Sequence, residues 1–401
     1  MKTADFVIVG GGIVGATLAL ELRRRFPDQS VVICEKEAHL GAHSSTRNSG
    51  VIHSGIYYDP VSVKAKVCHE GAKRMIAFQE ENNLAIRKMG KLLVCPEETM
   101  TDQIDLLHQR AGRNGLEASV IDAPTLAEME PEARSAGGRA IFVPITAVGD
   151  PGATMRVIES HLKDNGVEVI TSAGFAKHDA NNAISLSDGQ TIDCGYFINA
   201  AGGYADKVAH AFGLGLDYTM LPFRGLYWQL APHAGIHLNH LVYPVPDLRF
   251  PFLGVHTTTS IDGNVYLGPT ASPGFGREHY RGFAGVNLAD TLNNLFHSGM
   301  QFLGNKNGFR NLAFQEIKRL TKRGFVSEAR KILPRLTQSM LLPTSKAGVR
   351  AQIFDRYKGQ LVTDFLAVKG DRSLHILNSI SPAWTCSFGL AEYICDTYLE
   401  E

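Results

Sequence analysis

Directly after an apolar run at residues 6–9, the chain carries Gly10-Gly-Gly12-Ile-Val-Gly15, and a helical pattern follows to about Arg25. Gly10 permits a tight turn, Gly12 lets a phosphate group approach the backbone, and Gly15 brings the helix close to the strand. Free N–H groups and the helix dipole favour negative charge at such a helix start. The pattern predicts a βαβ unit that binds the pyrophosphate of a dinucleotide.

The second strand of this unit, residues 31–34, ends on Glu35, which lies 20 residues past Gly15. A carboxylate at this place accepts hydrogen bonds from ribose hydroxyls and repels a 2′-phosphate. The expected ligand is therefore NAD or FAD rather than NADP.

The composition narrows the class of protein. At 401 residues the chain exceeds one ordinary core, so we expect two lobes. The net charge of zero argues against nucleic acid as a partner. No segment approaches the roughly 18 apolar residues of a membrane span, and the early first strand leaves no room for a targeting peptide. The six cysteines include no C-x-x-C pair, which predicts reduced thiols in the cytoplasm and no metal site.

A second motif distinguishes between NAD and FAD as the expected ligand. Residues 43–58 are rich in hydroxyls and glycine, and they include Arg47, Asn48 and His53. A nicotinamide dehydrogenase would normally continue here into another strand and helix, whereas this segment has the composition of a loop that lies along an extended ligand. The alternative is an ordinary polar loop.

The run Arg47-Asn-Ser-Gly-Val-Ile-His-Ser-Gly-Ile-Tyr-Tyr58 resembles the flavin-contacting loop of FAD-dependent L-2-hydroxyglutarate dehydrogenases and oxidases, which are D-amino-acid-oxidase-like flavoproteins. Further similar segments span nearly the whole chain: 90–94, 243–256, 267–271, 348–352 and 378–383. The chain departs from the expected pattern at Leu226, Thr270, Thr363 and 384–386. The resemblance therefore constrains the substrate less than it constrains the cofactor.

The resemblance and the two motifs together predict FAD as the cofactor. In addition to the three glycines and Glu35, the residues expected to contact FAD are Lys36, Ser45, Thr46, Arg47, Asn48, Ser49, Gly50, Ala201, Gly202, Ser381, Pro382 and Ala383. In the family that the chain resembles, the glycine equivalent to Gly202 packs beside the pyrophosphate, and the segment at 381–383 lies at the flavin ring.

The expected architecture is an α/β fold with a discontinuous Rossmann-like FAD-binding domain and a second, α+β substrate domain built on a mixed sheet. The FAD-binding domain comprises residues 1–85, 148–215 and 341–401, and the substrate domain comprises 86–147 and 216–340. Periodicity and turn residues predict helices after Pro60 and at 101–114, 151–165 and 383 onward, a strand at 86–95, a hairpin turn at 188–189, and short strands at 225–230, 254–259 and 264–268.

Oxidation of a hydroxy acid requires a hydride acceptor, a base for the hydroxyl proton and a clamp for the carboxylate. The imidazole of His53 is the favoured base, with His256 as its rival, and either ring could instead serve only a structural role. Arg249 is the first candidate for the clamp because a guanidinium binds carboxylate through two hydrogen bonds. The alternative is that Arg249 pairs with Asp247.

Secondary candidates complete the predicted substrate site. Arg350, Arg224 and Arg277 could each bind a carboxylate, and the resemblance adds Tyr57 as a substrate contact.

Residues 286–340 are expected to be helical and basic. From Phe296 to Met340 nine Lys and Arg residues stand against Glu316 and Glu328, with apolar residues between the charges. One interpretation is a solvated helical face. The other is a peripheral contact with anionic lipid near a quinone that accepts the electrons.

The leading functional hypothesis is oxidation of L-2-hydroxyglutarate, a hydroxy-dicarboxylate, to 2-oxoglutarate by transfer of hydride to flavin N5. The electrons would pass to a quinone or to oxygen. Alternatives are an amino-acid or glycine oxidase, a glycerol-3-phosphate dehydrogenase-like flavoenzyme, and a flavin-binding assembly or redox-sensing protein without turnover.

Overall fold

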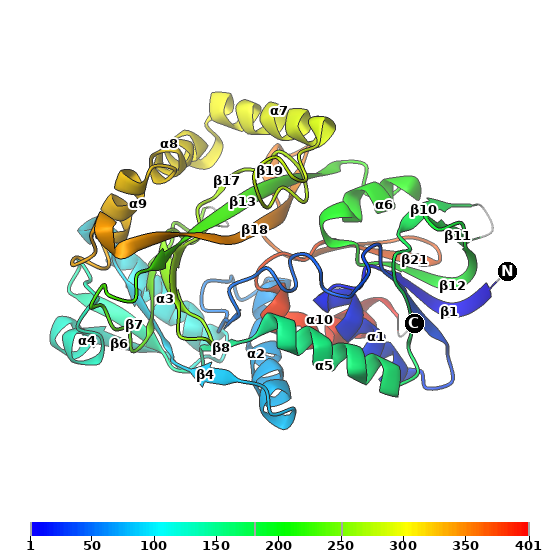
Figure 1. The fold of residues 1–401 in the computed structure, drawn as a ribbon, viewed down its shortest axis with the longest axis horizontal. Helices are drawn as coiled ribbons and strands as arrows, with labels where there is room; N and C mark the ends of the chain where they lie inside the picture. Colours follow the sequence, from blue (N-terminus) through cyan, green and yellow to red (C-terminus); the bar gives the residue numbers. More distant parts are fainter. Residues whose placement is uncertain (1, 180–181, 250–251, 400–401) are drawn as a thin grey trace.

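The computed structural model describes residues 2–179, 182–249 and 252–399 and consists of two lobes (Figure 1). The first lobe contains the N-terminal strand β1 (Lys2–Val9) and the C-terminal helix α10 (Ala383–Tyr398). The second lobe is built around two long strands, β13 (Tyr218–Leu230) and β18 (Leu341–Asp355). None of the helices in the described residues has the length and apolar character needed to cross a bilayer.

The first lobe contains an eight-stranded sheet with a parallel centre. In this sheet β1 lies between β2 (Val31–Cys34) and β12 (Thr191–Asn199) and is parallel to both. The other strands are β9 (Glu168–Ile170) beside β2, β21 (Ser373–Asn378) beside β12, β20 (Leu366–Lys369) beside β21, and the antiparallel pair β10 (Phe175–His178) and β11 (Ala183–Leu186).

Buried apolar residues explain why the centre of this sheet is parallel. All four residues of β2 are buried, and so are residues 6–9 of β1. Such uninterrupted apolar strands are typical of parallel sheets with helices on both faces. The helices of this lobe are α1 (Ile13–Arg25), α2 (Val63–Glu81), α5 (Pro151–Asp164) and α6 (Ala205–Ala211), together with α10.

Helices α2 and α10 cross at very short range. A Cβ atom on Gly71 would lie 2.8 Å from the Cα atom of Cys386, and one on Gly389 would lie 2.9 Å from the carbonyl oxygen of Val67. The start of α2 is fixed by Asp364, whose carboxylate accepts the N–H groups of residues 63 and 64 at 2.8 and 3.0 Å. These contacts fix the position of the N-terminus of α10.

The second lobe combines three smaller sheets. A six-stranded sheet has β13 and β18 at its centre, with β15 (His256–Thr259), β16 (Val265–Gly268), β17 (Ser272–Pro273) and β19 (Gln360–Leu361). A four-stranded sheet has the order β14 (Leu241–Pro244), β5 (Lys91–Val94), β7 (Arg139–Val143) and β6 (Ser119–Asp122). A three-stranded sheet contains β3 (Val51–Ile52), β8 (Ala147–Gly149) and β4 (Ile86–Lys88).

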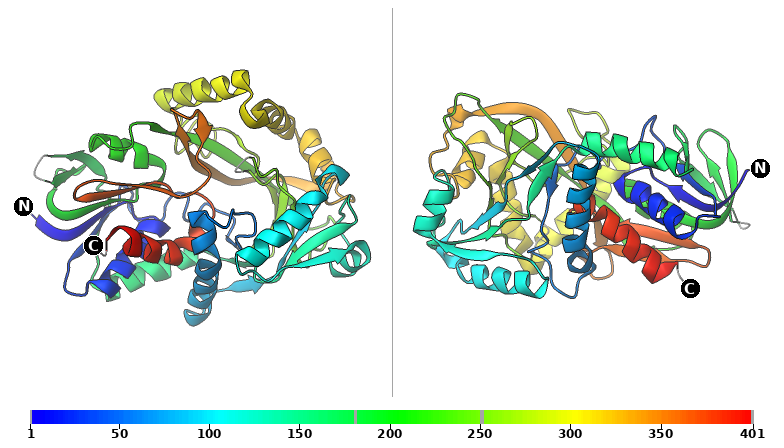
Figure 2. Two further views of the ribbon diagram at one scale, coloured as in Figure 1. Left: turned by 180° about the vertical axis from the view of Figure 1, so that it is seen from behind. Right: turned by 90° about the horizontal axis from the view of Figure 1, so that it is seen from below.

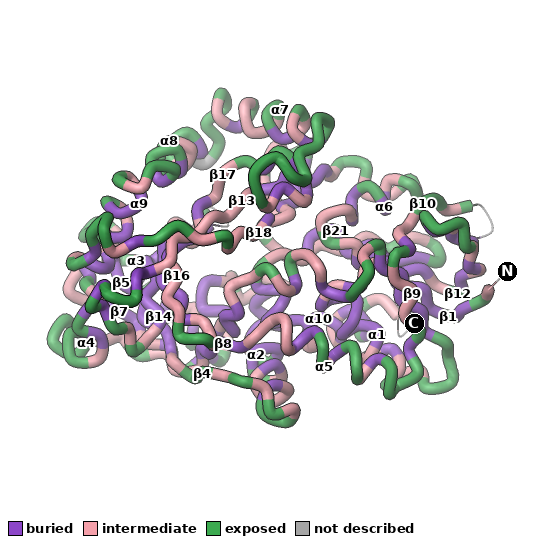
Figure 3. Tube along the Cα trace, viewed as in Figure 1, coloured by how far each residue is buried: buried purple, intermediate pink, exposed green. Residues whose placement is uncertain are grey.

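The remaining helices lie around these sheets. They are α3 (Asp102–Arg113), α4 (Ala123–Met129), α7 (Leu288–Gly304), α8 (Phe309–Arg319) and α9 (Lys322–Ala329). Figures 1 and 2 place α7 and α8 at the periphery of the second lobe. Figure 3 shows many exposed residues on these two helices, whereas buried residues concentrate in the sheets.

The structure confirms the mixed α/β fold and most of the expected elements. Helices α2, α3, α5 and α10 match the predicted ones within a few residues, and β11 and β12 form the hairpin that turns at residues 188–189. The predicted strand at 86–95 is instead divided into β4 and β5. Gly90 separates them, with a φ of +66° that an extended strand does not have.

One expected boundary is wrong. The chain was expected to return to the FAD-binding domain at residue 341, but β18 pairs with β13 along nearly its whole length and belongs to the second lobe. The first lobe resumes at β20, which begins at Leu366. Branched and aromatic residues in 349–354 suit a strand in either lobe, so composition could not assign this segment.

Candidate active site

Residues of both lobes line one cavity, which includes Gly12 and His256. The first lobe contributes the start of α1, much of the loop at 44–53, the segment 379–385, and Ala200, Gly202 and Gly203. The second lobe contributes residues of β13, β18, the chain near His256 and one acidic side chain, Glu316. The cavity therefore joins the predicted nucleotide site to the predicted oxidation site.

The glycine turn has the geometry that a pyrophosphate requires. Gly10 has a φ of +110°, and a Cβ atom there would lie 2.3 Å from the carbonyl oxygen of Ala200. A Cβ atom on Gly15 would lie 2.1 Å from the carbonyl oxygen of Gly10. Gly12 caps α1 without a side-chain hydrogen bond, and the first turn of α1 contains no acidic residue. The helix dipole therefore favours an anion at this start, where the N–H group of Ile13 already donates to the hydroxyl of Ser45 at 2.8 Å.

Glu35 is buried beside this turn. One of its carboxylate oxygens accepts the N–H group of Gly11 at 2.7 Å, and the other accepts that of Glu37 at 2.9 Å. These bonds fix the carboxylate at the end of β2, where a ribose is expected. Lys36 instead belongs to an ion-paired cluster, in which it donates to Glu278 at 2.6 Å and also contacts Glu37 and His43.

The loop between β2 and β3 follows the cavity as expected, with two exceptions. The lining residues include Ser45, Arg47, Asn48 and Ser49, but not Thr46 or Gly50. The hydroxyl of Thr46 donates to the carbonyl oxygen of Gly41 at 2.7 Å, and Gly50 has a φ of +78° and packs against Gly149. These two residues therefore stabilise the conformation of the loop and do not form part of the cavity wall.

Two further predicted segments reach the cavity. Gly202 lines it, although its predicted neighbour Ala201 does not. Ser381, Pro382 and Ala383 all line it and begin α10, so the N-terminus of a 16-residue helix lies at the cavity. Negative charge on a reduced flavin is favoured at such a helix terminus.

His256 and His53 both line the far end of the cavity. The Nδ1 atom of His256 lies 2.9 Å from the carbonyl oxygen of Gly254, so Nδ1 carries the proton and Nε2 keeps a lone pair. Its ring stacks on Tyr243 at 3.9 Å between centroids. Burial lowers the pKa of His256 to about 3. The imidazole is therefore neutral at physiological pH.

His53 is held by its backbone, whose N–H group donates to the hydroxyl of Thr385 at 3.0 Å. Burial lowers the pKa of His53 well below its ordinary value, and the nearby charges of Lys91, His256 and Arg350 lower it further. Both candidate bases are thus neutral rings in a cationic environment.

Arg350 lies on β18 opposite Phe223 and lines the same part of the cavity. Its guanidinium lies 5.3 Å from the ring centroid of Phe252. Burial lowers the pKa of this guanidinium, and the groups that oppose the shift are two tyrosines and Glu316. Arg350 is therefore the arginine that the structure brings to both histidines.

Arg249, the first candidate for the clamp, is not brought to the cavity. Its side chain is 63% exposed and forms an ion pair with Asp247 at 2.6 Å, in a second cavity beside α8. The alternative that the sequence left open, pairing with Asp247, is the one that the structure shows. The neighbouring residues 250–251 lie outside the described residues.

Three other residues that were predicted to bind the substrate also do not line the cavity. Arg224 donates to the carbonyl oxygen of Tyr280 at 2.9 Å and does not line the cavity. Arg277 is buried in an ion-pair network with Asp206 and Asp290. Tyr57 is buried behind the cavity wall, with its ring toward Lys91. Sequence spacing could not distinguish these structural roles from ligand binding.

Sequence reasoning missed several residues of this site. Glu316 reaches the cavity from α8, accepts the N–H group of Ala271 at 2.6 Å and is ion-paired with Arg319. It lies in a segment predicted to be a basic surface, so nothing in the sequence indicated this place. The sequence gives only a weak indication that Lys91 is important, because it is a single charged residue at the start of an apolar strand.

The buried histidines predict a loss of stability in acid. Unfolded histidine titrates near its ordinary pKa, whereas His256 in the folded protein has a pKa of about 3 and that of His375 is about 4. Below about pH 6.5 the unfolded chain binds more protons, so the free energy of unfolding falls by up to about 1.4 kcal/mol per pH unit and per histidine. Urea unfolding at pH 7.0 and 5.5 measures this loss, which His375→Asn should reduce.

Comparison with known proteins agrees with this geometry. The family model "FAD dependent oxidoreductase" matches residues 5–397. The chain is 36% identical over 393 residues to L-2-hydroxyglutarate dehydrogenase of Escherichia coli strain K12, covering 97% of this chain and 92% of that protein. It is 35% identical to the mitochondrial L-2-hydroxyglutarate dehydrogenase of Homo sapiens, covering 98% and 88%.

Solved structures share the fold at lower sequence identity. L-α-glycerophosphate oxidase of Mycoplasma pneumoniae, solved with FAD bound, superposes with a TM-score of 0.77 at 22% identity and covers 98% of this chain and 94% of that one. Glycine oxidase of Geobacillus kaustophilus superposes with a TM-score of 0.70 at 16% identity, with coverage of 98% and 94%.

The glycine turn, the buried carboxylate of Glu35 and the start of α10 all lie within the residues that the family model matches. The chain therefore belongs to the FAD-dependent oxidoreductase family, as an FAD-dependent enzyme related to the L-2-hydroxyglutarate dehydrogenases.

Proposed function

We propose that the protein oxidises L-2-hydroxyglutarate to 2-oxoglutarate. The observation that carries this proposal is the convergence of Arg350, His53 and His256 at one end of the cavity, where the single carboxylate among the lining residues, Glu316, is already ion-paired. Such a site attracts an anion and offers neutral imidazoles to accept a proton. The relatives named L-2-hydroxyglutarate dehydrogenase supply the substrate.

The reaction removes a hydride from C2 and a proton from the C2 hydroxyl, and a C=O bond forms. FAD, which the glycine turn and the start of α10 would hold, would supply the hydride acceptor when bound. Arg350 binds a carboxylate and so fixes the orientation of C2. The hydroxyl proton passes to the lone pair of a cavity histidine. Because Nδ1 of His256 is engaged by Gly254, His256 offers a defined acceptor at Nε2.

Binding of the anionic substrate also changes the pKa of the two histidines. Burial and nearby cations lower the pKa of both rings. A bound dicarboxylate supplies negative charge beside them and raises their pKa. Proton uptake by imidazole is therefore favoured when substrate is present.

An anaerobic spectrum tests the function. L-2-Hydroxyglutarate should bleach the flavin band near 450 nm, and the D-enantiomer should leave it unchanged. Bleaching by glycine or glycerol 3-phosphate alone would instead support the activity of a glycine oxidase or of an L-α-glycerophosphate oxidase, after which the two structural neighbours are named. A flavin that no small acid or amine reduces would favour a protein without turnover.

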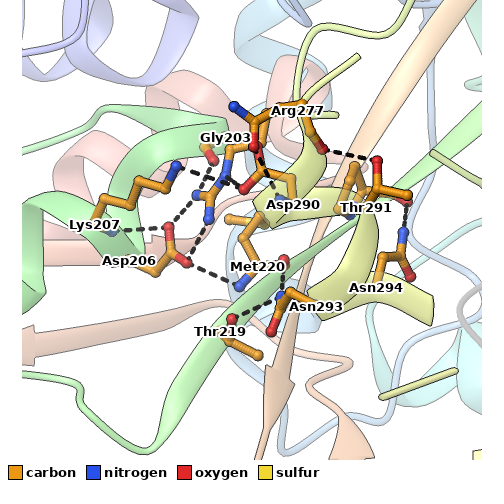
Figure 4. A network of polar contacts seen from close by, with 12 residues as sticks. Gly203, Asp206, Lys207, Thr219, Met220, Arg277, Asp290, Thr291, Asn293 and Asn294 are labelled. Atoms are coloured by element: carbon orange, nitrogen blue, oxygen red, sulfur yellow. Dashed lines mark hydrogen bonds and ion pairs between the residues drawn. The ribbon is translucent and has the colours of Figure 1, made fainter. Parts of the chain in front are cut away.

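We further propose that electrons pass to a membrane quinone and that α7 and α8 contact the membrane. An ordinary surface helix buries apolar residues and exposes polar ones. In helix α7 the buried residues are instead polar: Asp290, Asn294 and Gln301. Asn294 donates to the carbonyl oxygens of Pro222 and Gly274 at 2.6 and 3.0 Å, and Asp290 pairs with Arg277 (Figure 4).

The outer face of α7 is correspondingly apolar. Leu288, Phe296 and Leu303 are 72%, 63% and 72% exposed. We define the α7–α8 apolar surface as the exposed apolar residues Leu288, Leu292, Leu295, Phe296, Met300 and Leu303 of α7 with Phe314, Ile317 and Leu320 at α8. The two helices meet through Phe302 and Phe314, whose ring centroids lie 5.6 Å apart. Exposed apolar patches of this kind mark interaction sites.

The charges around this surface favour anionic lipid as its partner. Among the described side chains of residues 286–327, every exposed charged one is basic: Lys306, Arg310, Lys318 and Arg323. The two acidic side chains in that range, Asp290 and Glu316, are buried in ion pairs. Apolar residues with flanking cations are typical of helices that lie in the interface of an anionic membrane.

Vesicle flotation tests this contact. The holoenzyme should float with vesicles that contain phosphatidylglycerol and should bind pure phosphatidylcholine weakly. Leu292→Glu with Phe296→Glu should abolish flotation and leave flavin reduction by the substrate unchanged, because both side chains point away from the cavity. Val61→Glu, at an 82% exposed residue outside this surface, is the control. Equal flotation of both variants would contradict the assignment, and a concentration-dependent dimer would assign the surface to a second copy of the chain.

A further inference from the structure

Lys91 is an unusual residue for the interior of a protein. It begins β5, its side chain is 0% exposed, and its ammonium group has no hydrogen-bond partner among the described residues. The groups nearest to the ammonium are two aromatic rings, those of Tyr57 at 4.7 Å and Tyr243 at 5.4 Å from the centroids. Cation–π attraction replaces only part of the hydration that a buried ammonium loses. A methionine of similar shape would fill the same space without this cost.

The place of Lys91 connects it to the oxidation site. Tyr243, whose ring is one of its two neighbours, stacks on His256 at 3.9 Å and meets the ring of His53 edge-on at 6.4 Å. One tyrosine ring is therefore in contact with the ammonium and with both candidate bases. Lys91 itself does not line the cavity.

The surrounding groups leave this ammonium without a counter-ion. The titratable and charged groups that face Lys91 and the two histidines come from every adjoining element: His53, Tyr57 and Tyr58 from the loop after β3, Cys68 of α2, Tyr227 of β13, Tyr243 of β14, His256 of β15, Arg350 of β18 and Glu316 of α8. The one carboxylate in this set, Glu316, is ion-paired with Arg319.

We propose that Lys91 is a positioning residue for the oxidation, whose buried charge behind Tyr243 adds to the effect of burial on His53 and His256 and so keeps both rings neutral and proton-accepting over a wider pH range until an anionic substrate enters. The inference rests on the proposed role of these histidines as proton acceptors. In support, the charge of Lys91 contributes to the lowered pKa of both imidazoles. Burial lowers the pKa of Lys91 itself to about 7, so the group is protonated in the acidic range where histidine titrates.

Lys91→Met tests the proposal in the holoenzyme. Removing a nearby positive charge raises the pKa of the histidines, so the acid limb of kcat/KM for flavin reduction should move to higher pH by about one unit. Lys91→Arg, which keeps the charge, should restore the wild-type limb. The Tm of Lys91→Met should be unchanged or higher, because an unpartnered buried charge is replaced by an apolar side chain.

Lys322→Met is the matched control. This lysine also lies over an aromatic ring, that of Trp228 at 5.2 Å, but its ammonium donates to the carbonyl oxygen of Leu341 at 2.9 Å and lies outside the cavity. The pH profile of kcat/KM for flavin reduction in Lys322→Met should equal that of the wild type. If Lys91→Met lowers the Tm and leaves the acid limb in place, Lys91 has a structural role and the proposal is overturned.

A second measurement does not depend on the substrate. Diethyl pyrocarbonate modifies only neutral imidazole, and peptide mass spectrometry reports the modification rates of His53 and His256 separately. Between pH 7 and 4 both rates, taken relative to free N-acetylhistidine at each pH, should stay high in the wild type and should begin to fall at a higher pH in Lys91→Met. Equal profiles in the two proteins would overturn the proposal. If L-2-hydroxyglutarate does not reduce the wild-type flavin, the proposed function fails, yet this measurement still decides the role of Lys91.

Discussion

His256→Asn should lower kcat for L-2-hydroxyglutarate by about 10²- to 10⁴-fold, the range over which a positioned general base contributes to a reaction. The asparagine amide can still donate to the carbonyl oxygen of Gly254, so the local fold is kept while the lone pair at Nε2 is lost. FAD content and the Tm should stay close to the wild-type values. Anaerobic stopped-flow reduction measures the rate without any contribution from reoxidation.

Two further variants make this result specific. His53→Asn should cause a smaller loss if His256 is the base, and a larger loss in His53→Asn would give the role to His53, as the sequence first suggested. His279→Asn is the matched control, since His279 is also buried but hydrogen-bonds to Gly282 at 2.8 Å outside the cavity. If none of the three changes the rate, a base is not required, and an amine becomes the better substrate.

The sequence predicted the nucleotide end of the site well because that end is made by a continuous segment. Gly10, Gly15 and Glu35 lie in one βαβ unit, and their roles follow from backbone sterics and from spacing along the chain. The strand and helix that connect them leave few arrangements open. The structure places all three as expected.

The oxidation end could not be predicted in the same way because it is assembled from distant segments. His53, His256 and Arg350 come from three parts of the chain, and Lys91 and Glu316 come from two more. Which arginine reaches the cavity depends on the pairing of β13 with β18, which puts Arg350 opposite Phe223. The composition around Arg249 suggested a buried cation that needs an anion, and Asp247, two residues away, already supplies one.

The α7 segment shows a similar limit. The segment was predicted to be helical, but an apolar period in a helix predicts only that one face is apolar, not that this face lies against the protein. Which face of α7 lies against the protein is decided by Asn294 and Asp290. Asn294 donates to Pro222 of β13 and Asp290 pairs with Arg277, and these two partners are far apart in the chain. These polar contacts anchor the helix through its hydrophilic side and leave its leucines exposed.

Arg350→Met should raise KM for L-2-hydroxyglutarate by about 10²- to 10³-fold while the flavin stays bound. Removing one partner of a buried charged pair costs about 3–5 kcal/mol, and each 1.4 kcal/mol corresponds to a factor of ten. Arg350→Lys should have an intermediate effect, because an ammonium lacks the two parallel hydrogen bonds of guanidinium. Steady-state kinetics with an artificial dye as acceptor measures KM for each variant.

Arg249→Met is the control that separates the two arginines. Arg249 is exposed and paired with Asp247, so its loss should leave KM within about twofold of the wild-type value, as expected for a surface ion pair. The opposite pattern, a large effect at Arg249 and none at Arg350, would return the clamp to Arg249. L-2-Hydroxybutyrate, which lacks the second carboxylate, then identifies the group that Arg350 binds. An equal loss of kcat/KM for both substrates in Arg350→Met means that Arg350 holds the C1 carboxylate, whereas a loss confined to L-2-hydroxyglutarate means that it holds the distal carboxylate and selects for dicarboxylates.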